Sequence, residues 1–141
     1  MELGPLQKKW VQYLKDNPTL QGSGYLGIFE EDKPKELCCL GAYLICYNAS
    51  KNVSNKIVNG NLVDDYDNSG LSVSYDELGL LDAVGAFVFF DNETFHQDME
   101  GVDFGKNNNR DLASANDGGV TWLEIAEFIE QQPEKVFTKS V

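Results

Sequence analysis

The segment from Glu36 to Tyr47 constrains the fold of this chain more than any other. It reads Glu-Leu-Cys-Cys-Leu-Gly-Ala-Tyr-Leu-Ile-Cys-Tyr, and it holds all three cysteines of the protein and its densest apolar run. A run that is apolar at nearly every position is typical of an element buried on all sides. We therefore expect a hairpin whose second arm, Glu36 to Cys39, runs directly into a buried helix through Tyr47. Periodicity alone does not separate that helix from a longer strand.

Two further segments have the apolar spacing of amphipathic helices. Apolar residues recur along one face of residues 5–16, and Asn17-Pro18 ends that helix. Thr121 and Glu124 form a capping box that opens a helix over about 121–132, which Pro133 ends. The sequence also predicts a fourth helix near 75–85 and a helical turn over 111–115.

Strands and polar stretches complete the expected architecture. The aromatic segment 25–29 predicts a strand, and residues 21–24, Gln-Gly-Ser-Gly, predict a flexible link before it. The polar stretches 48–74 and 91–110 predict surface loops, the first with a short strand at 56–58 or 62–63. We expect an α+β fold in one domain over residues 1–141, with three to four helices packed on a small antiparallel sheet or hairpin.

The charge balance excludes some classes of partner. Eleven basic residues face twenty-three acidic residues, which gives a formal net charge of −12. Nucleic acids and anionic membranes attract clustered basic residues, and this chain has no such cluster. We therefore expect neither nucleic-acid binding nor membrane binding. An acidic surface that engages a basic protein is a second interpretation of the same charge.

The cysteines indicate a reducing compartment. Their number is odd, and Cys38 and Cys39 are adjacent, an arrangement that disulfide geometry disfavours. The first residues, Met-Glu-Leu-Gly-Pro, lack the basic and apolar regions of a secretion signal. We expect free, mostly buried thiols in a cytoplasmic protein.

The cysteines have two possible chemical roles besides a role in packing. Cys39 near a helix start is placed like an activated nucleophile, with His96 as its only histidine partner. Three cysteines and one histidine also match the ligand count of a zinc site, but their spacing does not match a chelating knuckle. We expect cysteines that fill the core, and no catalytic residue is assigned.

One loop resembles a calcium-binding loop. Asp65, Asp67 and Ser69 stand at its first, third and fifth positions, Gly70 at its sixth and Asp76 at its twelfth. The apolar eighth position is taken by Ser72, and no entering helix precedes Asp65. An ordinary polar loop is the preferred interpretation, and calcium at these four ligands is the alternative. No other cofactor is expected.

The segment Asn116-Asp-Gly-Gly before the last helix is interpreted as a turn followed by a helix cap. The alternative is an anion held by backbone N–H groups at that helix start.

Several motifs recur together in a widespread group of small uncharacterised phage and prophage proteins. They are Trp10-Val-x-x-Leu14, Gln21-Gly-x-Gly-Tyr-Leu26, Cys38-Cys-Leu-Gly41, Asn116-Asp, Thr121-Trp122, Ile125-Ala and Phe128-Ile-Glu130. Over about half of its length the chain resembles that group, whereas residues 48–110 match nothing in it. The resemblance implies a phage or prophage origin, with the host cytoplasm as its compartment. It implies no activity and no site.

The functional interpretation follows mainly from what is missing. The sequence has no phosphate-binding loop, no paired-histidine metal helix and no serine elbow. We expect a non-enzymatic accessory or interaction protein that binds an unidentified protein partner. The alternative is a small-ligand binder or enzyme with a pocket near Cys39 and His96. A filled apolar core at the cysteine helix favours the first.

Overall fold

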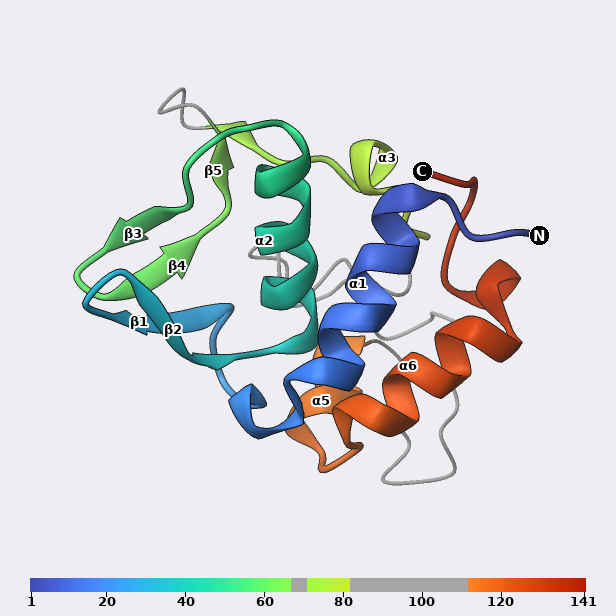
Figure 1. Cartoon of the computed structure of the whole chain (residues 1–141), viewed down its shortest axis with the longest axis horizontal. Coiled ribbons are helices and arrows are strands. Elements are labelled where there is room, and N and C mark those ends of the chain that lie inside the picture. The colour runs from blue at the N-terminus through green and yellow to red at the C-terminus, as the bar shows by residue number, and fades with distance from the viewer. Residues whose placement is uncertain (67–70, 82–111) are drawn as a thin grey trace.

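The computed structural model describes residues 1–66, 71–81 and 112–141, and its fold class is α+β in one domain. A small antiparallel sheet lies on one side of the molecule, helix α2 (Cys39–Ser50) in the middle, and helices α1 (Pro5–Asp16) and α6 (Trp122–Gln131) on the other side (Figure 1). The fold class predicted from the sequence is confirmed.

The sheet has the strand order β2-β1-β4-β3, and every neighbouring pair is antiparallel. Strands β1 (Gly27–Glu30) and β2 (Lys33–Leu37) form the first hairpin, and β3 (Lys56–Val58) and β4 (Asn61–Val63) form the second. The two hairpins meet where Ile28 pairs with Asn61. The sequence predicts one short strand in the polar stretch 48–74, at 56–58 or 62–63, and the structure has a strand at each of these places. The sequence places the second arm of this hairpin at Glu36 to Cys39, whereas β2 begins at Lys33, because the turn needs only Glu31 and Asp32. Strand β2 ends at Leu37, since Cys38 is already the N-cap of α2.

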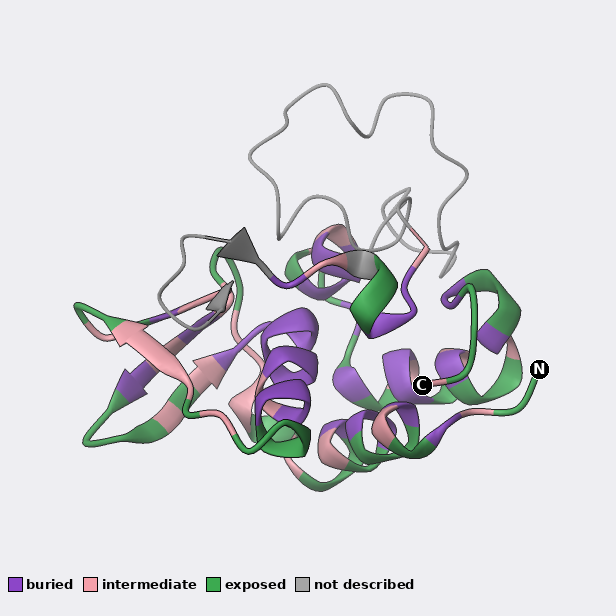
Figure 2. Ribbon diagram, turned by 90° about the horizontal axis from the view of Figure 1, so that it is seen from above, coloured by how far each residue is buried: buried purple, intermediate pink, exposed green. Residues whose placement is uncertain are grey.

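Helix α2 is the core of the molecule. Nine of its twelve residues are buried, and Figure 2 shows it buried through most of its length between the sheet and the other helices. This confirms the buried helix predicted for the cysteine segment, and it extends that helix to Ser50. A helix without a polar face needs partners on every side, and the sheet, α1 and α5 (Leu112–Asp117) supply them.

A glycine lets the chain pass close to the start of α2. A Cβ atom added to Gly41 would lie 1.9 Å from the main-chain oxygen of Leu26. That same oxygen accepts a hydrogen bond from the Cys38 N–H at 3.0 Å. Because Gly41 has no side chain, the segment before β1 packs directly against the first turn of α2.

Aromatic rings join α1, α2 and the end of the chain. The Trp10 and Tyr43 rings stack with centroids 4.1 Å apart, and Phe137 meets both rings edge-on. The Trp10 indole N–H donates to the Cys39 main-chain oxygen at 2.8 Å, and the Tyr43 hydroxyl donates to the Leu78 oxygen at 2.6 Å. The indole N–H and the hydroxyl thus both have hydrogen-bond partners inside the core, as buried tryptophan and tyrosine side chains require.

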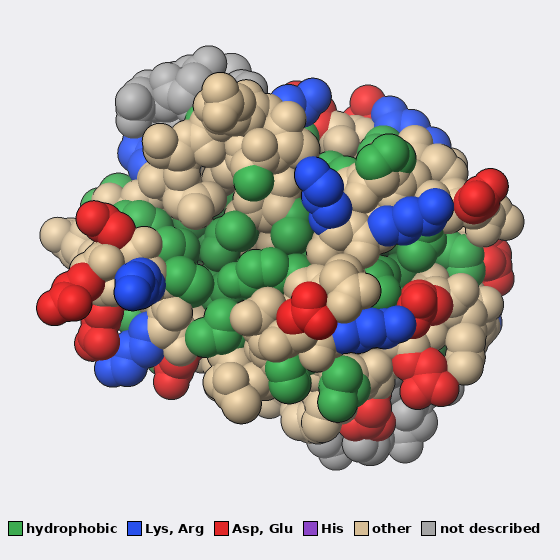
Figure 3. Space-filling model, viewed as in Figure 1, with side chains coloured by type: hydrophobic (Ala, Val, Ile, Leu, Met, Phe, Trp, Pro, Cys, Tyr) green, Lys and Arg blue, Asp and Glu red, His purple; other side chains and the backbone are tan. Residues whose placement is uncertain are grey.

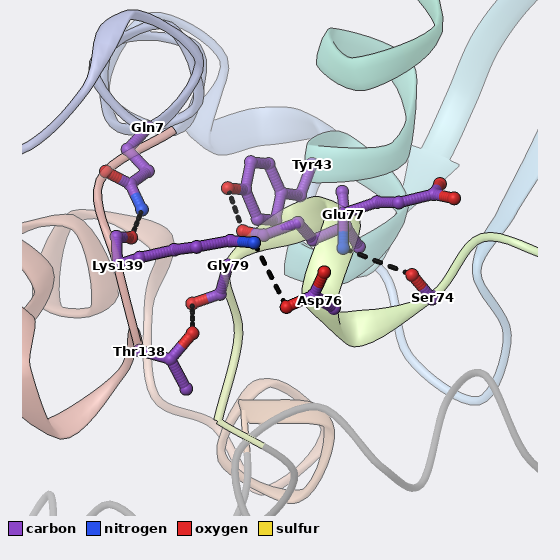
Figure 4. Close-up of polar contacts among 9 residues, drawn as sticks. Gln7, Tyr43, Ser74, Asp76, Glu77, Gly79, Thr138 and Lys139 are labelled. Carbon is purple, nitrogen blue, oxygen red and sulfur yellow. Dashed lines mark hydrogen bonds and ion pairs between the residues drawn. The ribbon is translucent and has the colours of Figure 1, made fainter.

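The last residues, 136–141, form a segment that we name the C-terminal strap. It runs between the start of α1 and the chain just after α3 (Tyr75–Leu78), where Leu80 bridges to Phe137. The Thr138 N–H donates to the Gly79 oxygen. The Thr138 hydroxyl also donates to that oxygen, and the Gln7 side-chain amide donates to the Lys139 oxygen (Figure 4). The strap therefore connects two parts of the chain that are distant in sequence.

The helix expected near 75–85 is shorter in the structure. Helix α3 ends at Leu78, because Gly79 adopts a φ of +65° and the chain then turns toward Phe137. Residues 82–85 lie outside the described part, as does the polar stretch 91–110. The short helix expected over 111–115 is found as α5 over Leu112–Asp117, and the remaining short pieces are β5 (Asp65–Tyr66), β6 (Leu71–Ser72) and the 3-10 turns Pro18–Leu20 and Pro133–Lys135.

Helix α6 begins as the sequence predicts. Thr121 is its N-cap, and its side chain accepts from the Glu124 N–H while the Glu124 carboxylate accepts from the Thr121 N–H. Residues Gly118 and Gly119 make the turn before it, whereas Asn116 and Asp117 belong to α5. Within the described ranges, no helix has both the length and the apolar character needed to cross a membrane.

Candidate functional site

Asn116 is the centre of a buried polar cluster that we name the asparagine hub (Gln21, Gly22, Cys39, Asn116, Trp122). Its side-chain oxygen accepts from the Trp122 indole N–H at 2.9 Å, from the Cys39 N–H at 3.1 Å and from the Gln21 amide at 3.3 Å. Its side-chain nitrogen donates to the Gly22 oxygen at 2.6 Å. Asn116 is only 3% exposed, so these bonds satisfy a polar side chain inside the core.

Gln21 extends the hub to the start of α6. Its amide nitrogen donates to the Val120 oxygen at 2.7 Å, and its amide oxygen accepts from the Trp122 N–H at 3.0 Å. The sequence predicts a flexible link at residues 21–24, and for Gln21 this is wrong because both ends of its amide are bonded. Gly24, three residues later, donates to the Asp117 carboxylate.

The hub brings together motifs that lie far apart in the chain. Gln21-Gly22, Cys38-Cys39, Asn116-Asp117 and Trp122 all contribute atoms to it or border on it. Each of these motifs was recognised in the sequence, but their contact was not predicted. No local signal indicated this contact, because Asn116 is followed by Asp117 and two glycines, a pattern typical of an exposed turn.

None of the three cysteines forms a disulfide, and all three are buried. Burial raises the pKa of the Cys38 thiol from its ordinary 9.0 to about 11, although Cys38 also accepts a hydrogen bond from the Gly41 N–H at 3.3 Å. Burial likewise raises the pKa of the Cys46 thiol to about 11, and the positive charge of Lys9 opposes that shift. Both thiols therefore stay protonated at neutral pH, which disfavours nucleophilic chemistry at either one.

Cys39, the candidate nucleophile, has no exposed surface. Its thiol donates to the Leu112 main-chain oxygen at 3.5 Å, and its main chain is bonded to Asn116 and Trp10. His96 lies outside the described residues, so the Cys39/His96 pair stays a prediction. Around Cys39 itself the structure has a filled apolar core.

The candidate calcium loop is described only in part. Asp67 and Ser69 lie outside the described residues, and Asp65 pairs through its backbone with Ser72 in the β5–β6 hairpin. The Asp76 carboxylate lies 3.0 Å from the Lys139 ammonium, at the start of α3 (Figure 4). Calcium at Asp76 would compete with this ion pair, and the calcium site stays a prediction. Within the described ranges, no three cysteine, histidine or carboxylate side chains are grouped to hold a metal.

The anion considered at the start of α6 has few N–H groups left to bind it. The Trp122 N–H donates to Gln21 and the Glu124 N–H donates to Thr121, so two donors of the first turn are already used. The helix cap at Thr121 is confirmed, and the turn is found at Gly118 and Gly119, whereas Asn116 and Asp117 are the last residues of α5.

Two hollows open beside α1. Lysine side chains gather over that helix on the face drawn in Figure 3. One has a volume of about 500 Å³ and lies between α1, α6 and the first residues, with Lys8, Lys15, Val11 and Glu130 on its walls. The other has a volume of about 380 Å³ and lies between the start of α1 and the end of α2. Neither hollow is lined by a cysteine, and the sequence did not indicate either one.

No protein-family model, no curated protein and no solved structure matches this chain.

Proposed function

We propose that this protein is a non-enzymatic accessory protein, of phage or prophage type, that binds another protein in the cytoplasm. The observation that supports this proposal best is the burial of the cysteine segment. Cys39 is fully buried, its thiol bonds to a main-chain oxygen, and its surroundings are filled by apolar side chains. The residues of the sequence that are best suited to catalysis therefore pack in the core and form hydrogen bonds with the main chain.

The charge distribution supports a protein partner of basic character. The tip of the first hairpin presents Glu30, Glu31 and Asp32, all exposed, and α6 presents Glu127 and Glu130. Exposed acidic groups steer oppositely charged partners and contribute more to association rate and specificity than to affinity. The resemblance to small phage proteins supports the origin and is independent of the structure.

Alkylation with iodoacetamide under native conditions separates this proposal from its alternative, an enzyme or ligand binder using Cys39. The proposal expects all three thiols to react far more slowly than a free peptide thiol, and to react fully after unfolding in urea. Fast modification of Cys39 in the native protein contradicts the proposal. Mass spectrometry of the peptide that contains Cys38 and Cys39 identifies the site.

Capture experiments test the partner directly. The tagged full chain is incubated with a bacterial lysate at low and at high salt, next to a variant whose hairpin-tip acids are neutralised (Glu30→Gln, Glu31→Gln, Asp32→Asn). The expected result is a partner that binds at low salt, is released at high salt and is lost with the variant. A matched control neutralises three exposed acids outside this set, Glu2, Asp16 and Glu134. Retention of no protein beyond the background of an unrelated acidic protein contradicts the proposal.

A further inference from the structure

The turn between β3 and β4 carries a further inference. It consists of Asn59 and Gly60, and Asn59 is the only asparagine of the chain that is followed by glycine. Asn59 is exposed at the tip of the second hairpin. Attack of a main-chain nitrogen on the side-chain amide of the preceding asparagine closes a five-membered succinimide ring. Glycine favours this attack, because it places no side chain beside its own nitrogen.

The peptide unit that joins Asn59 to Gly60 is not held by the rest of the sheet. Within the described residues, neither the Gly60 N–H nor the Asn59 main-chain oxygen forms a hydrogen bond. The bonds of the hairpin lie on either side of this unit. Val58 pairs with Asn61, and the Gly60 oxygen, which belongs to the next peptide unit, accepts from the Phe29 N–H at 2.7 Å. The peptide unit therefore rotates without breaking a hydrogen bond to any described residue.

Rotation of this unit produces the geometry of ring closure. The φ values of 52° at Asn59 and 81° at Gly60 match a type I′ turn, in which ψ of the first residue is about +30°. A half-turn of the peptide unit gives a type II′ turn, in which that ψ is about −120° and φ of the second residue is negative. Gly60 adopts either sign of φ, and both turns suit a two-residue hairpin.

The two turns place the attacking nitrogen differently. In the type I′ turn the Gly60 nitrogen lies on the opposite side of the Asn59 Cα–C bond from the side chain. In the type II′ turn it lies on the same side, as a five-membered ring requires. The type II′ turn favours glycine at its first position, so with Asn59 there it is the minor form. The reactive conformation is therefore a neighbour of the folded turn and needs no separation of the strands.

We propose that Asn59 is a site of spontaneous modification, at which the folded protein converts this asparagine into aspartate and isoaspartate. The Gly60 nitrogen loses its proton and forms a bond to the Asn59 Cγ. The Cγ–Nδ2 bond breaks, and the side-chain nitrogen leaves as ammonia. Water then adds to one of the two ring carbonyls and opens the succinimide to aspartate or isoaspartate. Water is the only co-reactant, and nothing is oxidised or reduced.

The structure distinguishes this turn from a second candidate pair, Asp117 and Gly118. Asp117 is also exposed and followed by glycine, and an aspartate closes the same ring with loss of water. However, the Gly118 N–H donates to the Ser114 oxygen at 2.8 Å, and the Asp117 carboxylate accepts from the Gly24 N–H at 3.3 Å. Ring closure there breaks bonds that fix the end of α5, so Asp117 serves as an internal control.

The modification acts on the junction of the two hairpins. Isoaspartate carries the main chain through the side-chain carbon, so a two-residue turn gains one backbone atom. The register of a hairpin depends on the length of its turn. The neighbouring contacts, Gly60 with Phe29 and Ile28 with Asn61, join β4 to β1. Conversion of Asn59 is therefore an irreversible change that loosens the second hairpin from the first and adds one negative charge.

Peptide mapping of the aged protein tests the proposal. The full chain is kept at body temperature at neutral and at mildly alkaline pH, and its peptides are analysed by mass spectrometry with electron-transfer fragmentation, which separates aspartate from isoaspartate. The expected result is both products at Asn59, formed faster at the higher pH because the Gly60 nitrogen must lose its proton. Asp117 is expected to stay unchanged in the folded chain and to isomerise after unfolding in urea.

Gly60→Asn is the matched variant. A Cβ atom at this position meets only the Phe29 oxygen, at 3.6 Å, and asparagine accepts a positive φ, so the turn is kept. The new side chain obstructs the attacking nitrogen, and conversion of Asn59 is expected to be about ten-fold slower or more. Circular dichroism verifies that the variant is folded. An equal rate in the variant and the natural chain overturns the proposal.

Destabilised proteins show whether the reaction passes through the folded turn. Asn116→Ala and low concentrations of urea weaken the whole fold without touching Asn59, and both should leave its rate of conversion unchanged. A rate that rises with destabilisation, or no product while the urea-unfolded chain converts completely, overturns the proposal. The hairpin-tip variant of the capture experiment keeps Asn59 and Gly60, so this proposal and the proposed function fail independently.

Discussion

Asn116 illustrates how a single buried side chain specifies this fold. Its oxygen accepts from three donors, on the loop before β1, at the start of α2 and in α6, and its nitrogen donates to the loop again. A buried polar group that is fully satisfied defines one arrangement of its partners, since any other leaves donors unpaired.

Asn116→Ala is expected to destabilise the protein by about 3 kcal/mol, because it leaves the Cys39 N–H, the Trp122 indole and the Gly22 oxygen without this partner. Urea unfolding followed by tryptophan fluorescence measures the loss. Asn61→Ala, at an exposed position of β4, is the control and should change stability by less than about 0.5 kcal/mol. Equal effects of the two variants would contradict the role of the hub.

The buried thiols predict a loss of stability at alkaline pH. Burial raises the pKa of Cys38 and of Cys46 from 9.0 to about 11, so the folded state keeps both thiols neutral where the unfolded state ionises them. Their contribution is fully present below pH 9 and is lost as the pH rises through about 11. Unfolding free energies measured between neutral and alkaline pH should fall in this window.

Cys38→Ser is the variant that isolates this effect. A serine hydroxyl keeps an acceptor for the Gly41 N–H but does not ionise in this range. The decline between pH 9 and 11 should be smaller in Cys38→Ser than in the natural chain, while the buried Cys46 and Tyr43 keep part of it. An identical decline in both proteins is the result that speaks against this assignment.

At the scale of elements, the two hairpins of the sheet use the same turn with different residues. The β3–β4 turn has Asn59 and Gly60 at φ values of 52° and 81°, whereas the β1–β2 turn has Glu31 and Asp32 at 52° and 63°. Positive φ at both central positions suits Asn-Gly and disfavours side chains such as glutamate. The first hairpin thus carries a conformational cost that the second avoids.

Replacing Glu31-Asp32 by Asn-Gly is expected to stabilise the protein by about 1 kcal/mol, because both positions then suit their backbone conformation. Thermal unfolding measures the gain. The reverse exchange, Asn59→Glu with Gly60→Asp, is the matched control and should destabilise by a similar amount. If both exchanges leave the melting temperature unchanged, strain is not stored in the first turn.

The C-terminal strap is a second element whose contribution is measurable. It satisfies the Leu6 and Gln7 N–H groups, the buried Gln7 side chain and the Gly79 oxygen. Truncation after Phe137 is expected to cost about 3 kcal/mol, since it leaves the start of α1 and a buried amide without partners. Lys139→Gln removes only an exposed ion pair and should cost less than about 1 kcal/mol. Chemical denaturation of the two proteins provides the comparison, and similar losses would exclude a main-chain role for the strap.

At the scale of the whole molecule, the net charge of −12 opposes folding by self-repulsion. Added sodium chloride screens this repulsion, so the melting temperature should rise with salt. A variant that removes four exposed acids (Glu31→Gln, Asp32→Asn, Glu127→Gln, Glu134→Gln) should show a weaker rise. Differential scanning calorimetry at a series of salt concentrations gives both slopes. If the melting temperature of the variant rises with salt as steeply as that of the natural chain, self-repulsion does not explain the salt effect.

Local patterns in the sequence determined several elements of the fold. The stripe of α1, the capping box of α6 and the apolar run of α2 predict helices near the residues where the structure has them, because periodicity and capping act over a few neighbouring residues. The short length of α3 was not predicted, since its end depends on a contact between Leu80 and the strap. The calcium ligands Asp65, Asp67, Ser69 and Asp76 stay a prediction.

The sequence by itself determined that the cysteine segment is buried, that the chain has a net charge of −12 and that its fold is α+β. Only the tertiary structure decided which distant residues meet: Gln21 with Asn116 and Trp122, and Lys9 with Lys51 around one hollow. The physical reason is that burial and helix formation depend on local composition, whereas polar clusters and hollows depend on the relative placement of elements that are tens of residues apart in the chain.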